Sequence, residues 1–250
     1  MARSNSAQLA PPGRDGRTPS QAIAAVPVSR RYAVTKRVID IAASLSIVTL
    51  GAPIWLLVGL AIKLDSRGPI LFKQRRVGRN GEEFVMYKFR SMLADADPKV
   101  HQEAFRLYAA GVHLEEDGQG GRFKAARDPR VTRVGHFLRA TNLDEFPQVF
   151  NVIKGEMSLV GPRPAISYEL EWYLDWYYGR FQATPGITGL WQIKDRFHIG
   201  MEDMMRYDVE YVRKRSTALD MKIIAATGLG PVLSLLRRFK NRGQRGSQES

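Results

Sequence analysis

One long apolar segment constrains this chain more than any other feature of its sequence. The segment VIDIAASLSIVTLGAPIWLLVGLAIKL, residues 38 to 64, carries charges only at Asp40 and Lys63, close to its two ends. As one straight helix of about 27 residues it would extend roughly 40 Å, which is enough to cross a hydrocarbon core of about 30 Å. It does not look like a cleavable signal, because it ends without a small-residue cleavage site. We therefore expect this segment to place the chain at a membrane.

Two features of the segment argue against a simple crossing. Pro53 divides it into arms of about fifteen and twelve residues, each shorter than the roughly twenty residues that a spanning helix needs. Positive charges flank both ends, and the positive-inside rule then favours both ends on the cytoplasmic face. The pattern predicts a re-entrant helix–break–helix over residues 32–66, while a spanning helix and a buried helix of a soluble protein remain as alternatives. The flanking charges are Lys36 and Arg37 before the segment and Arg67, Lys73, Arg75 and Arg76 after it.

Charge and composition limit the partners of the chain. Its 250 residues allow one substantial core together with a membrane element and tails. With 38 Lys and Arg against 25 Asp and Glu, the net charge of +13 indicates an anionic partner: nucleic acid, anionic lipid or a phosphorylated substrate. The absence of cysteine excludes disulfides, thiolate metal sites and a cysteine nucleophile. The four histidines show no metal-ligand spacing, and we interpret them as ordinary surface or core residues.

Two polar tails enclose the rest of the sequence. Residues 1–31 are rich in Pro, Ser, Ala, Gly and Arg and predict a disordered tail, and residues 237–250 predict a basic polar tail. Residues 67–236 then form one candidate catalytic domain. Near its end, residues 221–240 are apolar and then basic, which is typical either of an amphipathic helix in the membrane interface or of a C-terminal core helix.

A β-hairpin is predicted directly after the membrane segment. Residues 68–92 alternate apolar and polar side chains on both sides of Arg-Asn-Gly, which is a hairpin pattern. Lys88 and Arg90 are two residues apart, so on a strand their side chains lie on the same face. Residues 93–126 are charged, contain several glycines and show weak periodicity, as expected of an insertion or a mobile flap.

Two adjacent acids stand in the basic second half of the chain. Asp144 and Glu145 begin the run DEFPQVF, in which Asp144 is a candidate N-cap and Pro147 would occupy the first turn of a helix. Arg163 lies between two prolines, which stiffen the backbone around a guanidinium and suit a pre-positioned phosphate clamp. The cations around the acids form either a site or a solvated basic face. Three of them precede the acids: Arg130, Arg133 and Arg139.

At these residues the chain resembles the bacterial sugar transferases of the monotopic phosphoglycosyl transferase family, in the form without additional N-terminal spanning helices. The matching runs occupy about residues 36 to 224 in the order usual for that family, from KRVIDI through GPILFKQRRVGRNGEEFVMYKFRSM, DPRVTRVGHFLRATNLDEFPQVFNVIKGEMSLVGPRP and TPGITGLWQI to YDVEYVRKRSTALDMKII. The resemblance implies transfer of a sugar 1-phosphate from a UDP-sugar to a polyprenyl (undecaprenyl) phosphate. It also implies Mg²⁺, release of UMP and a covalent enzyme intermediate.

The resemblance also implies roles for particular residues. Asp144 would be the nucleophile and Glu145 the magnesium ligand, while Arg139 and Arg163 would bind phosphate. Lys88 and Arg90 match the basic pair of the family and are expected to bind substrate. A carboxylate suits either acidic role, because it ligates Mg²⁺ and attacks phosphorus. The surrounding arginines would stabilise charge on the transferred phosphate.

The chain departs from the usual family sequence at three places. Ala52-Pro53 replaces the usual Ser-Pro at the break of the membrane helix, so no hydroxyl at residue 52 is present to bond a freed carbonyl. The run DSRGP, residues 65–69, replaces DSPGP. The run QIKDRFHIG after Trp191 replaces the usual Ser-Gly-Arg, which leaves a role for Arg196 open.

Taken together, these patterns predict an α/β membrane-associated catalytic domain with an N-terminal re-entrant membrane helix and interfacial amphipathic helices. We expect it at the cytoplasmic face of the bacterial inner membrane, in the first membrane step of exopolysaccharide or other glycoconjugate assembly. The expected partners are UDP-sugar, polyprenyl phosphate and the membrane, without nucleic acid, and a homo-oligomer is compatible with the sequence. Two alternatives stay open: a membrane-anchored basic protein that binds nucleic acid or acidic lipid without catalysis, and a UDP-sugar hydrolase.

Overall fold

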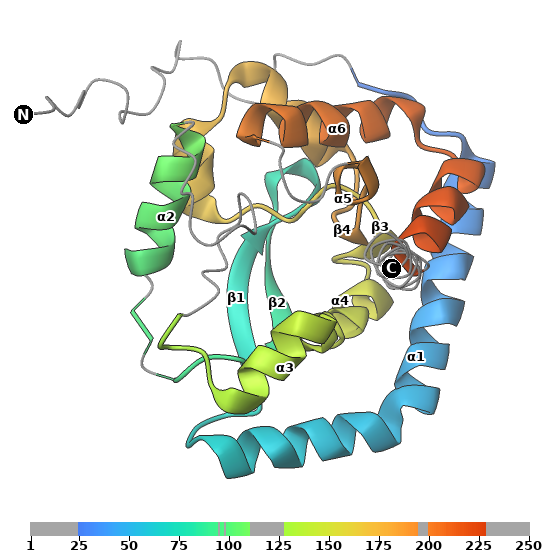
Figure 1. The fold of residues 1–250 in the computed structure, drawn as a ribbon. Coiled ribbons are helices and arrows are strands. Elements are labelled where there is room, and N and C mark those ends of the chain that lie inside the picture. The colour runs from blue at the N-terminus through green and yellow to red at the C-terminus, as the bar shows by residue number, and fades with distance from the viewer. Residues whose placement is uncertain (1–24, 95, 98, 111–127, 195–199, 229–250) are drawn as a thin grey trace, which may run out of the picture.

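The computed structural model describes residues 25–94, 96–97, 99–110, 128–194 and 200–228. Within these ranges a mixed domain of short helices and strands lies against one long helix, α1, Arg30–Asp65. Figure 1 shows α1 along the edge of the molecule as two arms that meet at a sharp bend. The strands form two separate two-stranded sheets rather than one central sheet. The expected α/β class is confirmed in the sense that the domain contains both helices and strands.

Helix α1 is bent rather than broken. Its helical hydrogen bonding continues through Pro53, which lies inside the element. Proline lacks an N–H and crowds the preceding turn, and this is the usual physical cause of a sharp bend in a helix. Apolar side chains along α1 remain largely exposed, with Leu50, Leu56 and Leu64 each more than three-quarters exposed. Among the described residues, α1 is the one helix that is long and apolar enough to cross a membrane.

The first part of α1 is tied to the domain by charged side chains. The Lys36 ammonium donates to the carbonyl of Val160 and to Asp220, both at 2.9 Å. One turn later, the Asp40 carboxylate accepts the backbone N–H of Leu159 at 3.0 Å. These contacts explain the charged residues at this end of the helix, because they bind residues 159–160 and the helix at 217–228.

The last residue of α1 is tied to the same domain. The Asp65 carboxylate accepts the backbone N–H of Val134 at 2.9 Å, near the start of helix α3, Arg133–Thr141. Ile62, one turn before it, is 2 % exposed and packs with Phe89 and Leu138. Both ends of α1 therefore bind a single folded unit.

The predicted hairpin is confirmed. Strand β1, Leu71–Val77, pairs antiparallel with β2, Glu83–Phe89, and the register places Leu71 opposite Phe89. The short helix η3, Arg79–Gly81, connects them, with Asn80 at φ 57° and Gly81 at φ 80°. These two residue types accept positive φ at the lowest cost, which is why Arg-Asn-Gly forms this turn.

The region read as an insertion or flap contains a packed helix. Helix α2, Lys99–Ala109, places Phe105 at 1 % exposure in a core cluster with Val77 and Tyr173. The expectation of a mobile flap was therefore wrong for this helix. Burial of its apolar stripe against the domain offsets the conformational entropy that is lost when the helix is ordered. The remainder, including the glycine-rich run at 117–123, lies outside the described residues.

The two acids lie in a tight turn between two helices. Helix α3 begins at an N-cap, Thr132, whose hydroxyl accepts the Gly135 N–H at 3.0 Å. It ends at Asn142, whose φ of 56° turns the chain into the short helix η4, Leu143–Glu145. The interpretation of Asp144 as an N-cap was wrong. Asp144 lies inside η4, and Pro147 occupies the N-cap position of helix α4, Gln148–Lys154.

The segment around Arg163 joins the hairpin to a second sheet. Strand β3, Ser158–Val160, pairs in parallel with β4, Gly186–Thr188. Between them, Ala165 forms an antiparallel bridge with Val77 at the end of β1. The chain thus carries Arg163 across the end of the hairpin. The connection also contains two short helices, η5, Ser167–Trp172, and η6, Asp175–Gln182.

Three C-terminal helices cover this side of the domain: α5, Leu190–Lys194, α6, Met201–Lys214, and a helix at 217–228. Met205 and Tyr211 of α6 are fully or almost fully buried. In the helix at 217–228, Ile223 is 0 % exposed and belongs to a core cluster, whereas Met221 is 47 % exposed. The described part of the predicted interfacial helix therefore packs on the core through one face, and residues 229–240 lie outside the described residues.

Most of the expected N-terminal tail also lies outside the described residues. Its last part is attached to the domain. The backbone N–H of Val26 donates to the Gln182 side chain at 2.8 Å, and its carbonyl accepts from Arg215 at 3.1 Å. The helix then begins at Arg30, two residues before the expected boundary of the membrane element.

Candidate active site

The structure brings a predicted cation and a predicted acid together from two elements. The Lys88 ammonium on β2 lies 3.5 Å from Oε1 of Glu145 in η4. Both side chains are about one-quarter exposed, at 23 % and 27 %, so the pair remains open to solvent on one side. A pair that is formed but accessible leaves carboxylate oxygens within reach of a ligand, and its contribution to stability is small.

Asp144 is much less exposed than its neighbour. The residue is 5 % exposed, because the turn at Asn142 directs it into the domain while Glu145 points toward Lys88. Arg139, in the last turn of α3, interacts electrostatically with Asp144. Burial lowers the pKa of Arg139, and the Asp144 charge opposes this shift. The Arg139 Nη1 atom is buried and forms no hydrogen bond within the part of the chain that the structure describes.

Arg90 takes a different position from Lys88. It directly follows β2, is 4 % exposed, and donates to the carbonyls of Ser66 and Arg67 at 2.7 and 2.9 Å. It also donates to the Ser66 hydroxyl at 2.9 Å. These acceptors lie just past the end of α1, so Arg90 satisfies backbone groups that a helix end leaves open. Its contacts give it a structural role, and its expected role in substrate binding stays a prediction.

Arg163 is paired inside the domain. Its two terminal nitrogens donate to the two oxygens of Glu169 at 2.8 and 3.0 Å. Glu169 is 0 % exposed, whereas the Arg163 side chain is 21 % exposed. Burial acts to lower the pKa of Arg163, but the Glu169 carboxylate outweighs it and holds that pKa above its ordinary value. The guanidinium is therefore permanently charged, with one edge held and the other reaching solvent.

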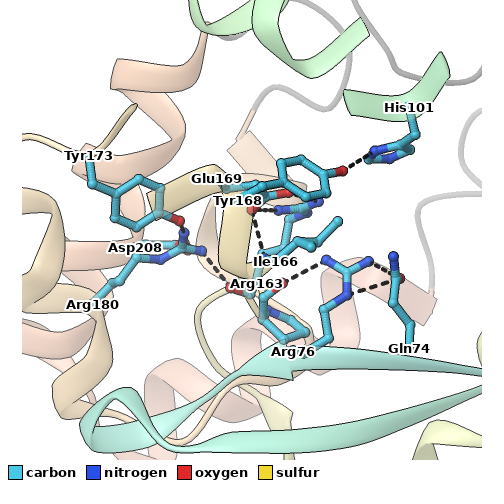
Figure 2. A network of polar contacts seen from close by, with 11 residues as sticks. Gln74, Arg76, His101, Arg163, Ile166, Tyr168, Glu169, Tyr173, Arg180 and Asp208 are labelled. Atoms are coloured by element: carbon cyan, nitrogen blue, oxygen red, sulfur yellow. Dashed lines mark hydrogen bonds and ion pairs between the residues drawn. The ribbon is translucent and has the colours of Figure 1, made fainter. Parts of the chain in front are cut away.

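A further cation, Arg76, was expected only as a flanking charge of the membrane segment and not as a site residue. It is 6 % exposed on β1 and donates to the Gln74 amide oxygen and to the Pro164 carbonyl (Figure 2). Burial, followed by the nearby charge of Arg163, lowers the pKa of Arg76 to about 10, and Glu145 partly opposes this shift. The two-residue alternation of a strand places Gln74 and Arg76 on one face, which is the signal that identifies them.

His101 was read as an ordinary residue, and it lies beside these cations. Its Nδ1 forms a hydrogen bond with the hydroxyl of Tyr168, and Figure 2 shows that hydroxyl pointing from η5 toward the imidazole on α2. Burial, with Arg163 as the next cause, lowers the pKa of His101 to about 4. At neutral pH the imidazole is therefore uncharged.

The arrangement suits a ligand that carries phosphate groups and a metal ion. Glu145 and Asp144 are adjacent carboxylates beside several fixed cations, and no group of three acidic or histidine side chains gathers among the described residues. Mg²⁺ is normally held by one or two carboxylates together with substrate phosphates and water. The donor set therefore fits Mg²⁺ bound with a diphosphate, and it does not fit a metal held by protein ligands alone.

The structure thus combines one long apolar helix with a candidate site of two adjacent acids among cations, and comparison with known proteins gives its family. The model of the bacterial sugar transferase family matches residues 31–233. The chain belongs to the bacterial sugar transferase family, and the resemblance noted in the sequence is confirmed.

Several characterised relatives share this region. The UDP-galactose-lipid carrier transferase of Erwinia amylovora is 43 % identical over 202 residues, which are 79 % of this chain and 40 % of the relative. The exopolysaccharide production protein ExoY of Rhizobium meliloti is 38 % identical over 194 residues, 78 % of this chain and 84 % of the relative. The UDP-glucose:undecaprenyl-phosphate glucose-1-phosphate transferase of Caulobacter vibrioides is 39 % identical over 200 residues, 77 % of this chain and 67 % of the relative. The chain spans about 40 % of the length of the Erwinia relative and of the undecaprenyl-phosphate galactose phosphotransferase of Salmonella typhimurium, which it matches at 39 % identity.

Proposed function

We propose that this protein transfers a sugar 1-phosphate from a UDP-sugar to undecaprenyl phosphate and releases UMP. The observation that carries the proposal is the turn η4, which sets a buried Asp144 and a partly exposed Glu145 among Lys88, Arg139 and Arg76. The names of the relatives support the same reaction class and include both galactose and glucose. They do not select one sugar for this chain.

The first half-reaction transfers the phosphosugar to the enzyme. A carboxylate oxygen of Asp144 attacks the phosphorus that bears the sugar, the bond from that phosphorus to the bridging oxygen breaks, and UMP leaves with the electron pair. The product is an aspartyl phosphosugar. Lys88, Arg139 and Arg163 bind phosphate oxygens and stabilise the charge that is spread over them in the transition state. Their value lies in being positioned before the reaction begins.

The second half-reaction moves the phosphosugar to lipid. A phosphate oxygen of undecaprenyl phosphate attacks the same phosphorus, the bond to Asp144 breaks, and the carboxylate is regenerated. The product is a lipid diphosphate sugar. Glu145, with the substrate phosphates, would hold Mg²⁺, and the ion would supply charge neutralisation at the diphosphate. The lipid is needed only in this half-reaction.

We propose further that α1 enters and leaves the membrane on the cytoplasmic face. Support comes from its two ends, because Lys36 and Asp40 at one end and Asp65 at the other all bind the same domain. A helix that crossed the bilayer would place those charged ends on opposite faces. Its exposed leucines need an apolar environment, and a bend inside the bilayer meets both conditions.

The nucleophile is tested by substitution and mass spectrometry. Asp144→Asn keeps the shape of a buried side chain but removes the nucleophilic charge, so we expect turnover to fall at least about 10³-fold with a thermal midpoint close to that of the wild type. Incubation of the wild type with UDP-sugar alone should add a phosphosugar to the peptide that contains Asp144. The Asn variant should carry no adduct. Wild-type-like turnover in that variant would assign the attack to another residue.

A further inference from the structure

The backbone that follows the Arg163 Cα is held by two other arginines. Nη2 of Arg180 donates to the carbonyl of Arg163 itself at 2.5 Å, and Nη1 of Arg76 donates to the carbonyl of Pro164 at 3.0 Å. Pro162 and Pro164 have no N–H, so at these positions the carbonyls are the groups by which the chain can be held. Figure 2 shows the two guanidinium groups approaching the Arg163 segment from different sides.

The Arg163 side chain is held as firmly as its backbone. Glu169 accepts both terminal nitrogens, and one of its oxygens also accepts the Ile166 N–H at 3.1 Å. The carboxylate thus closes the loop that follows Arg163 and orients the guanidinium with the same atoms. Such a fork-to-fork pair is geometrically specific, because two parallel hydrogen bonds allow one orientation.

Arg180 is in turn held by residues far from the acids. It donates to Asp208 of α6 at 2.5 Å and to the Tyr173 hydroxyl, and both members of the ion pair are at most 1 % exposed. A buried ion pair of this kind is weak evidence for stability, since apolar side chains of similar size usually stabilise a core as well or better. The pair instead orients Arg180, which holds the Arg163 carbonyl.

The charge balance of the network also indicates an anionic ligand near Arg163. Three arginines, Arg76, Arg163 and Arg180, face two carboxylates, Glu169 and Asp208. One positive charge in this set of described residues is left without a carboxylate. The side chain of Arg180 is 0 % exposed and Arg76 is 6 % exposed, whereas the Arg163 side chain is 21 % exposed. The network therefore reaches solvent at Arg163, where an anion can compensate the excess charge.

We propose that Arg180 and Arg76 are positioning residues that aim Arg163 at the diphosphate of the donor. This inference rests on the proposed function. Neither residue touches the substrate: each fixes a backbone carbonyl, so that Arg163 meets the phosphate without losing conformational freedom on binding. A guanidinium fork is needed at both places, because Arg76 bridges two acceptors and Arg180 bridges three, which the point charge of a lysine cannot reproduce.

A double-mutant cycle tests this proposal. Arg180→Lys and Arg76→Lys keep the charge and remove the fork, and each is made in the wild type and in an Arg163→Ala background. The two readouts are the affinity for UDP in the presence of Mg²⁺, by calorimetry, and kcat/KM for UMP release. In the wild type each substitution should weaken UDP binding about tenfold or more, with a larger rise in KM than fall in kcat. In the Arg163→Ala background the same substitutions should cause no further loss.

Val209→Ala is the matched control, because Val209 is a buried neighbour of Asp208 on α6 that takes no part in the network. It should lower the thermal midpoint and leave UDP affinity unchanged. If Arg180→Lys does not fold, the test is carried by Arg76→Lys alone.

Equal losses of UDP affinity in the wild type and in the Arg163→Ala background would overturn the inference. A wild type that binds UDP but releases no UMP would reject the proposed function, while the affinity cycle would still judge the positioning role; a wild type that binds no UDP would overturn both.

Discussion

At the scale of single residues, the candidate site places each acid beside a cation from another element. Lys88 on β2 meets Glu145, and Arg139 in α3 acts on Asp144. Because Asp144 is buried and Glu145 is about one-quarter exposed, the two adjacent carboxylates have different surroundings. Different surroundings are what allow neighbouring carboxyl groups to take different roles, one as nucleophile and one as metal ligand.

The uncharged His101 makes folding sensitive to acid. Its pKa is about 4 in the folded protein, owing first to burial and then to Arg163, against about 6.5 in an unfolded chain. A lowered folded pKa means that its stabilising contribution is complete above pH 6.5 and is lost as the pH falls toward 4. Between pH 7.5 and pH 5 we expect this residue to account for at most about 2 kcal/mol of lost stability.

Urea unfolding at these two pH values measures the effect. His101→Gln should lose less stability on acidification than the wild type does. His136→Gln, at an exposed position in α3, is the control and should behave like the wild type. Equal losses in the His101 variant and the wild type would show that other groups cause the acid sensitivity.

At the scale of elements, the junction of α1 with the hairpin depends on Arg90. Its donors satisfy the carbonyls of Ser66 and Arg67 just past the helix end, in a place where Arg90 is 4 % exposed. Arg90→Leu leaves those buried groups unpaired, and we expect a loss of about 2 to 4 kcal/mol in the free energy of unfolding.

Kinetics of the folded fraction separate this structural role from the predicted role in substrate binding. Under conditions where the Arg90→Leu variant remains folded, its KM for UDP-sugar should match that of the wild type. Lys88→Gln is the comparison: it should raise KM with little change in stability, because its pair with Glu145 is partly exposed. An Arg90 variant of normal stability and raised KM would restore Arg90 to the substrate site.

At the scale of the whole molecule, the path of α1 decides whether the residues before and after it lie on the same face of the membrane. Single cysteines at Ser29 and Arg67 flank the helix at exposed positions, and the natural chain has no cysteine. In intact cells both should be protected from an impermeant thiol reagent, and both should react after the cells are opened. Labelling of one site alone in intact cells would establish a spanning helix.

The sequence predicted those parts of the molecule that depend on interactions between residues close together in the chain. The apolar run predicted α1, and the Arg-Asn-Gly turn with alternating side chains predicted the hairpin. The resemblance located the acids, and η4 brings Glu145 to Lys88 as a shared site requires. The support of the Arg163 backbone was not predictable, because Arg180 and its partner Asp208 come from distant segments and meet through tertiary packing. Helix α2 was missed because its short amphipathic pattern lies among charged and glycine-rich residues.

The identity of the released nucleotide reports which bond breaks, and it therefore tests the proposed mechanism. The reaction contains the purified protein, Mg²⁺, UDP-sugar and undecaprenyl phosphate, and the nucleotides are separated and quantified. Attack by Asp144 on phosphorus predicts UMP, with a single turnover of UMP in the absence of lipid and steady turnover in its presence. UDP as the main product would mean that the bond between sugar and phosphate breaks instead. That result, or steady turnover that does not depend on the lipid, would contradict the account.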